Sequence, residues 1–151
     1  MVSTTLLAGD MGGTKTLLAL YRSEHGNLRP LHQQRFQSSD WPSLEPMLEA
    51  FLRDRPQEAL RPSHACIAVA GPVRNREAQI TNLPWQLRED DLARAAGLEQ
   101  LELVNDFGVP MYGLPHLSPQ QQVPLQKGTR DQGPLASLGA GTGLGMARGV
   151  R

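Results

Sequence analysis

The spacing of apolar residues changes along the chain, from short runs near the start to a helical repeat near residue 44. Three β-leaning apolar runs come first, at residues 4–9, 16–21 and 31–36, and each predicts a strand. Between residues 43 and 54, apolar residues recur at every third or fourth position, which predicts a helix with one buried face. The residues of that face are Leu44, Met47, Leu48, Phe51 and Leu52. Ser43 can cap this helix, because a serine side chain accepts a hydrogen bond from the first unpaired amides.

Strand and helix patterns alternate through the middle of the chain. The continuous apolar run "HACIAVAG" at residues 64–71 predicts a strand buried on both faces. The segment "REDDLARAAG" at residues 88–97 predicts a short helix that ends at Gly97. The run "LELV" at residues 101–104 predicts another strand.

Weaker patterns lie around and after these elements. Residues 77–82 predict a short strand, and residues 107–114 predict a short helix that Pro110 interrupts. Residues 115–134 are rich in Pro, Gln and Gly, which is typical of a connector. The segment "PLASLGAGTGLGMARGV" at residues 134–150 predicts a strand, a glycine loop and a second strand.

This order of elements predicts an α/β fold with a mixed sheet. The first three strands can pair as an antiparallel meander, and the later strands, which helices separate, can join parallel to it. The change of composition further predicts a small N-terminal domain at residues 1–114, a connector at 115–134 and the beginning of a second domain at 135–151.

Composition excludes several classes of protein. The 15 basic and 15 acidic residues cancel, which disfavours nucleic acid or an anionic membrane as the main partner. The N-terminus lacks a basic leader and no apolar run approaches ~18 residues, so we expect a cytoplasmic protein without a membrane span. The one cysteine, Cys66, fits a reducing compartment, and its apolar surroundings predict an inert core thiol. His64 and His116 show no metal-ligand spacing.

The first glycine turn, in "GDMGGTKT", has features of an anion site. Gly12 and Gly13 can adopt positive φ and bring their amides close to a phosphate, and Thr14 and Lys15 can add a hydroxyl donor and a positive charge. An acid beside phosphate is explained by Mg²⁺ between them, so Asp10 is a candidate metal ligand, with water retained on the ion. The spacing of Gly and Lys excludes a P-loop. A plain hairpin turn is the alternative.

A second glycine-rich turn, "LGAGTGLG", lies near residue 141. Its glycines fall at every second position, so the dinucleotide fingerprint does not fit it. Its candidate phosphate-binding residues are Gly139, Gly141, Thr142 and Gly143. So many glycines suggest close approach of another group to the backbone, with turn chemistry alone as the alternative. Two such hairpins together could hold a polyphosphate.

The two glycine turns, with "ACIAVAGPV", "TNLPW" and "LVNDF" between them, resemble the bacterial glucokinase family in sequence and order. This family has the hexokinase-like fold of the actin-like ATPase and sugar kinase superfamily, which is related to ribonuclease H. The resemblance implies ATP-dependent phosphorylation of glucose at its 6-hydroxyl, with Mg²⁺, in a cleft between two domains. Kinases for another hexose remain an alternative.

The resemblance also implies roles for an Asn-Asp pair that follows the predicted strand at 101–104. In the family the aspartate, here Asp106, is the general base, and both it and Asn105 bind the sugar. Asn82 lies by resemblance near the sugar, whereas Trp85 and Gly71 are expected to serve packing and a turn. Taken alone, Asn105 and Asp106 also fit an ordinary strand end or helix cap.

Members of the family are about twice as long as this chain, as expected for two domains. The resemblance implies that a Gly-Glu-Gly-Gly-His sugar segment, an adenosine pocket and a C-terminal helix that returns to the small domain are absent here. We therefore expect residues 1–151 to be inactive alone. A truncated, non-catalytic ligand-binding module is the alternative, and a homodimer is a candidate assembly.

Overall fold

The computed structural model describes residues 4–80, 82–126, 128, 133–140 and 144–149. The chain forms two compact units, Met1–Asn105 and Asp106–Arg151. The division of the sequence into residues 1–114, 115–134 and 135–151 stays a prediction.

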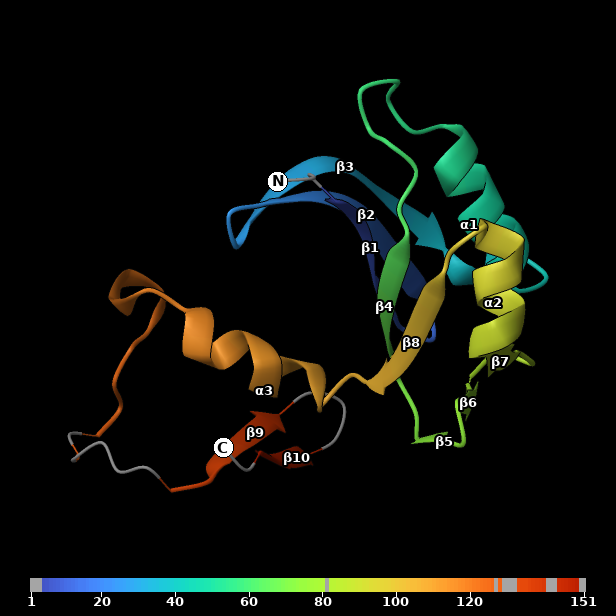
Figure 1. The fold of residues 1–151 in the computed structure, drawn as a ribbon. Coiled ribbons are helices and arrows are strands. Elements are labelled where there is room, and N and C mark those ends of the chain that lie inside the picture. Colours follow the sequence, from blue (N-terminus) through green and yellow to red (C-terminus); the bar gives the residue numbers. More distant parts are fainter. Residues whose placement is uncertain (1–3, 81, 127, 129–132, 141–143, 150–151) are drawn as a thin grey trace. The chain divides into compact units, whose positions relative to one another are not determined.

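The first unit is built on a five-stranded mixed sheet with the order β3-β2-β1-β4-β8 (Figure 1). The strands are β1 (Thr4–Met11), β2 (Lys15–Glu24), β3 (Asn27–Gln37), β4 (His64–Val69) and β8 (Gln100–Asn105). The first three form an antiparallel meander, and β4 and β8 add parallel to β1. The predicted α/β class and the predicted pairing are confirmed.

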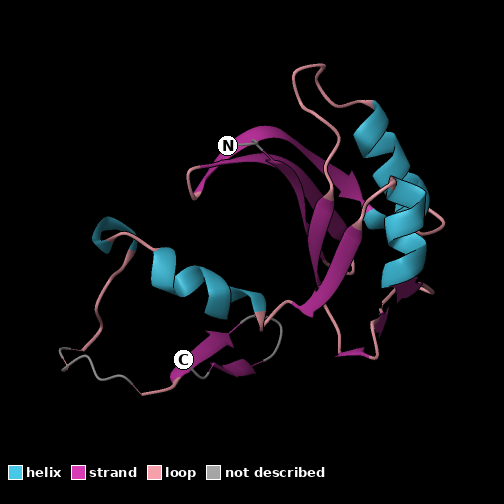
Figure 2. Ribbon diagram, in the orientation of Figure 1, coloured by secondary structure: helices cyan, strands magenta, loops and turns pink. Residues whose placement is uncertain are grey.

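Two helices, α1 (Leu44–Arg53) and α2 (Glu89–Ala96), lie side by side and pack with one face of this sheet (Figure 2). All five apolar residues predicted for α1 are buried and join the core of the sheet. The α2 helix ends at Gly97, whose φ of 65° is the left-handed conformation that glycine adopts at low cost. Ser43 stands at the cap position of α1, but its side chain makes no capping hydrogen bond.

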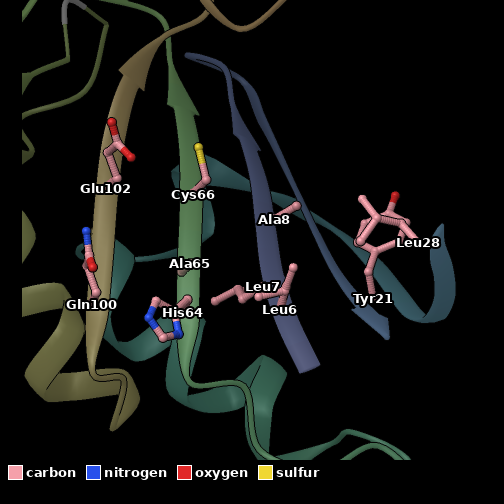
Figure 3. Close-up of a pocket in the computed structure, with 10 residues that line it drawn as sticks. All are labelled: Leu6, Leu7, Ala8, Tyr21, Leu28, His64, Ala65, Cys66, Gln100 and Glu102. Atoms are coloured by element: carbon pink, nitrogen blue, oxygen red, sulfur yellow. The ribbon is translucent and has the colours of Figure 1, made fainter. Parts of the chain in front are cut away.

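Among the described residues of the first unit, no helix lies on the opposite face of the sheet, which forms an open groove of about 340 Å³ (Figure 3). Cys66 is exposed there, so the prediction of a core thiol was wrong, and β4 is buried on both faces only in its second half, at Ala68 and Val69. The reason is that side chains alternate along β4, which puts Ile67 in the core and Cys66 in the groove. Partial burial, and then the Glu102 carboxylate, raise the pKa of the Cys66 thiol, which disfavours the reactive thiolate.

A second, three-stranded antiparallel sheet contains β5 (Val73–Arg74), β6 (Glu77–Gln79) and β7 (Gln86–Arg88). Of these strands, only β6 was predicted. The buried Glu89 at the start of α2 ties this region to the main sheet. Its Oε1 accepts the backbone N–H of Leu103 in β8 at 2.9 Å, and its Oε2 accepts Nε–H of Arg76 at 2.7 Å. Because β8 is an edge strand, the Leu103 amide has no strand beside it to pair with, and the Glu89 carboxylate accepts its hydrogen bond instead.

The second unit contains a short helix, α3 (Val109–Gly113), and an antiparallel hairpin of β9 (Leu135–Ala140) and β10 (Leu144–Gly149). The 3₁₀ turns Leu114–His116 and Pro119–Gln121 follow α3. Pro110 does not interrupt α3, because it lies in the first turn, where no amide donor is needed. The predicted strands of the hairpin are confirmed.

Candidate active site

The first glycine turn closes the hairpin between β1 and β2. The N–H of Gly12 donates to the carbonyl of Lys15 at 2.9 Å, so this amide serves the turn. Neither Gly12 nor Gly13 has φ in the left-handed region, and the expectation of positive φ was wrong. Gly13 has little free space around it: a Cβ there would lie 3.0 Å from both Cβ and Nδ2 of Asn82, so the Asn82 side chain would have to shift.

Two buried side-chain hydroxyl groups stabilise this turn, and neither residue was predicted to belong to the site. Ser38 follows β3 and is fully buried, as is Thr16 at the start of β2. Their hydroxyl oxygens lie 3.0 Å apart, and the Ser38 hydroxyl also donates to the carbonyl of Gly12 at 3.3 Å. The backbone N–H of Ser38 donates to the carbonyl of Thr14 at 2.9 Å. Thr16 and Ser38 lie at strand ends, where polar residues are common. The sequence therefore did not distinguish them from ordinary strand-end residues.

The parallel register places candidate residues at one edge of the first unit's sheet. Asp10 of β1 pairs with Ala68 of β4, and Val69, one position later, pairs with Asn105 of β8. With strands about 4.8 Å apart, Asp10 and Asn105 stand on strands separated by roughly 10 Å. This is the carboxyl end of the parallel strands, the edge at which α/β sheets bind ligands.

The side chain of Asn105 is oriented by the turn that follows β4. Its Nδ2 donates to the carbonyl of Gly71 at 2.8 Å. The predicted turn at Gly71 is thus present, and its carbonyl fixes one side of the Asn105 amide. Gly71 itself leaves little room, because a Cβ there would lie 3.0 Å from the carbonyl oxygen of Gln79.

Asn82 and Trp85 have different environments within one short loop. Trp85 is 3% exposed and belongs to the core, which confirms packing as its role. Asn82 is exposed, and its amide lies against Gly13 of the first glycine turn. The structure therefore brings a predicted sugar-binding residue to the predicted phosphate turn.

Asp10 suits a hydrated Mg²⁺. Its carboxylate is exposed at the strand end directly before the glycine turn, and Thr14 and Lys15 beyond the turn are also exposed. The described residues contain no group of three or more His, Cys, Asp and Glu side chains that could hold a metal ion by themselves. A single exposed carboxylate such as that of Asp10 is compatible with Mg²⁺, which usually keeps several waters and takes one or two carboxylates together with substrate phosphates.

In the second unit, Asp106 and the second glycine hairpin are linked by Phe107. The Asp106 Oδ1 accepts the backbone N–H of Phe107 at 2.9 Å. The ring of Phe107 lies against Gly139 of β9 and Gly145 of β10. Gly141, Thr142 and Gly143 lie outside the described residues. Phe107 was not among the predicted site residues, although the sequence contains an aromatic residue beside an acid and a hairpin with glycine at every second position.

A family model described as Glucokinase matches residues 7–151, which is nearly the whole chain. The chain belongs to the glucokinase family. A glucokinase of Trichormus variabilis is 44% identical over 148 residues, a match that covers 95% of this chain and 42% of the relative. The chain therefore spans less than half the length of the curated relatives that it matches.

Solved structures agree with this membership of the glucokinase family. A glucokinase from an Antarctic psychrotroph superposes with a TM-score of 0.85 at 32% identity, over 97% of this chain and 46% of the other. A glucokinase from Balamuthia mandrillaris, solved in complex with glucose, shares the fold with a TM-score of 0.66 at 22% identity, over 97% of this chain and 44% of the other. No helix within the described part of the chain is long and apolar enough to cross a membrane.

Proposed function

We propose that this chain is the N-terminal part of an ATP-dependent glucokinase that phosphorylates the 6-hydroxyl of glucose. Membership of the family supports the reaction, and one observation within the chain supports the site. The parallel register of β1, β4 and β8 brings the first glycine turn and Asn105 to the same edge of the sheet. A phosphate acceptor and a phosphate donor need to meet at such an edge.

Asn105 and Asn82 are the proposed sugar ligands of the first unit. The Asn105 amide is held by the Gly71 carbonyl, so its position does not depend on the sugar. A pre-positioned amide aligns a hydroxyl at less entropic cost than a mobile one. The contact of Asn82 with Gly13 supports a position for this residue between the sugar hydroxyl and the transferred phosphate.

Asp106 is the proposed general base, and it also binds the sugar. A carboxylate is a sufficient acceptor, because the transition state of phosphoryl transfer is loose and the proton leaves late. The hydrogen bond from the Phe107 amide occupies Oδ1 of Asp106 and orients the carboxylate.

The proposed phosphate ligands come from both glycine hairpins. They are Gly12, Gly13, Thr14, Lys15, Gly139, Gly141, Thr142 and Gly143. Asp10 would hold Mg²⁺, through water, and the bound ion would neutralise charge on the phosphates. Lys15 is exposed and adds positive charge next to the turn. We further propose a cytoplasmic protein, with a homodimer as its candidate assembly.

A second candidate is a non-catalytic module that binds ligand without turnover. Within the enzyme class, a kinase for another hexose is the competing specificity.

A coupled assay with ATP, Mg²⁺ and a panel of hexoses tests these candidates on two proteins. One is residues 1–151, and the other carries this chain at the start of a chain as long as its relatives. We expect glucose phosphorylation by the longer protein at an ordinary rate, on the order of 10 s⁻¹, and none by residues 1–151. Turnover by residues 1–151 would show that this part is sufficient. A longer protein that prefers another hexose would refute the glucose assignment.

A further inference from the structure

The ring of Phe107 occupies the space of two absent side chains in the second unit. Gly139 and Gly145 stand directly opposite each other in the β9–β10 hairpin, so their side-chain positions share one face. A Cβ on Gly139 would lie 2.7 Å from Cε1 of Phe107, and a Cβ on Gly145 would overlap Cζ, Cε1 and Cε2. Because real Cβ atoms do not approach so closely, both positions require glycine as long as the ring stays.

A second contact of the same kind lies further along β10. A Cβ on Gly149 of β10 would lie 2.9 Å from Cε of Met111 in α3. Phe107 lies in the turn before α3 and Met111 lies within α3, and both side chains contact glycines of the hairpin. Because Gly139, Gly145 and Gly149 have no side chains, the segment that begins at Phe107 packs directly against the backbone of the hairpin.

Asp106 directly precedes this segment, which packs on the β9–β10 hairpin. Its Oδ1 accepts the N–H of Phe107 at 2.9 Å, so the carboxylate is bonded to the peptide group that carries the ring. The Cα of Phe107 carries both the ring and this N–H, so packing of the ring on the hairpin restrains the position of the N–H. The orientation of the Asp106 carboxylate is therefore coupled to the contact between Phe107 and the two glycines.

We propose that Phe107 is a positioning residue that holds the Asp106 carboxylate at a fixed position relative to the second glycine hairpin. The proposal rests on the proposed function, in which Asp106 is the base and this hairpin binds phosphate. It assigns Gly139 and Gly145 a role in placing the base, because they admit the ring. A displacement of about 1 Å at a reacting group can lower the rate by about 10²-fold, so the effect is expected in kcat.

The first test compares two Phe→Leu variants in the longer protein that carries this chain. Phe107→Leu should lower kcat by about 10–10²-fold at saturating glucose and ATP, with KM for both within about threefold of the parent. Phe51→Leu is the matched control, because Phe51 is fully buried in the core of the first unit. It should lower the melting temperature and leave kcat within about threefold. A Phe107→Leu enzyme with the kcat of the parent would overturn the proposal.

The second test is a double-mutant cycle on the contact itself. Gly145→Ala should lower kcat about as much as Phe107→Leu, because the methyl group displaces the ring. In a Phe107→Ala background, the same Gly145→Ala change should cost less than about threefold, since the ring that it would displace is gone. Fully additive losses would overturn the positioning role.

The parent enzyme separates the two levels of inference. A parent that does not phosphorylate glucose overturns the proposed function, and the role of Phe107 fails with it. An active parent with additive variants leaves the proposed function standing and overturns only the positioning role.

Discussion

In the β1–β2 hairpin the glycines lie in the turn itself, whereas in the β9–β10 hairpin Gly139 and Gly145 lie opposite each other within the strands. Gly13 leaves room for the Asn82 amide, and the paired glycines leave room for the Phe107 ring. One hairpin therefore brings a polar group toward the backbone, and the other brings an apolar ring. Similar glycine-rich sequences leave room for a polar side chain in one unit and for an aromatic ring in the other.

The two hairpins also differ in support. The β1–β2 pair is part of a five-stranded sheet, with the buried hydroxyls of Thr16 and Ser38 beneath its turn. The β9–β10 pair forms a two-stranded sheet, and its outer face exposes Leu138 and Met146. Two strands alone are marginally stable, so the second hairpin depends more strongly on its neighbours.

The largest effect is expected at the acid joined to the second hairpin. Asp106→Asn keeps size and most hydrogen bonding but removes the proton acceptor, so kcat should fall by about 10²–10⁴-fold. That loss corresponds to roughly 3–5 kcal/mol of transition-state stabilisation. The measurement is kcat of the longer enzyme at saturating glucose and ATP.

Two neighbouring variants serve as controls for Asp106. Asn105→Ala should mainly raise KM for glucose, and Asp10→Asn should change the dependence on Mg²⁺–ATP. An Asp106→Asn enzyme with a kcat within about threefold of the parent would mean that Asp106 only terminates the strand, because loss of a base costs at least ~10²-fold.

A smaller effect is expected at the first glycine turn. Gly13→Ala pushes a methyl group against the Asn82 amide, and KM for ATP should rise about tenfold, which is the lower part of the usual 1–3 kcal/mol cost of overpacking. Gly113→Ala in α3 is the matched control, because a Cβ there meets nothing within 4 Å. Equal KM values for the two variants would show that the space at Gly13 is not needed for the nucleotide.

The buried hydroxyl pair beneath the first turn should contribute to stability alone. Ser38→Ala leaves the buried Thr16 hydroxyl without its partner and should lower the free energy of unfolding by about 1–3 kcal/mol. Adding Thr16→Val removes the unsatisfied group and should recover much of that loss. Denaturant titration, read from the midpoint at constant slope, measures both variants. A double variant that loses the sum of the two single costs would contradict this account.

The smallest effect is expected on self-association through the second hairpin. Exposed strand edges and the apolar pair Leu138 and Met146, which are directly opposite each other, favour pairing with a second copy. We therefore expect residues 1–151 to dimerise or aggregate through this hairpin, and Leu138→Lys with Met146→Lys should shift it toward monomer. Leu60→Lys changes an equally apolar residue exposed in a loop of the first unit and should have no effect. Light scattering that shows a monomeric parent would refute the expectation.

The amino-acid sequence was sufficient to predict the main elements of the first unit. The repeat around Leu44 and Phe51 specifies a helix face, because burial follows a period of 3.6 residues. The order of three strands, helix and strand specifies the meander and its parallel additions. Gly97 marks a helix end because only glycine adopts the left-handed conformation easily. These features depend on local conformation and on which side of an element is apolar.

Other features depended on contacts between residues far apart in the chain. The strand at β4 reads as doubly buried, yet Cys66 is exposed, because exposure depends on whether another element covers that face. The sequence alone does not show whether Asn82, Phe107 or a ligand occupies the space beside Gly13 and Gly145. Ser38 is likewise recognisable only once β3 returns it to the Gly12 carbonyl.

The sequence by itself thus determined the family, the succession of strands and helices, and the chemical types of the candidate site residues. The tertiary structure decided which groups meet: Asn82 with Gly13, Asn105 with the Gly71 carbonyl, and Phe107 with Gly139 and Gly145. The physical reason is that periodicity and turn chemistry act over a few residues, whereas close packing is a relation between surfaces that only the folded chain brings together.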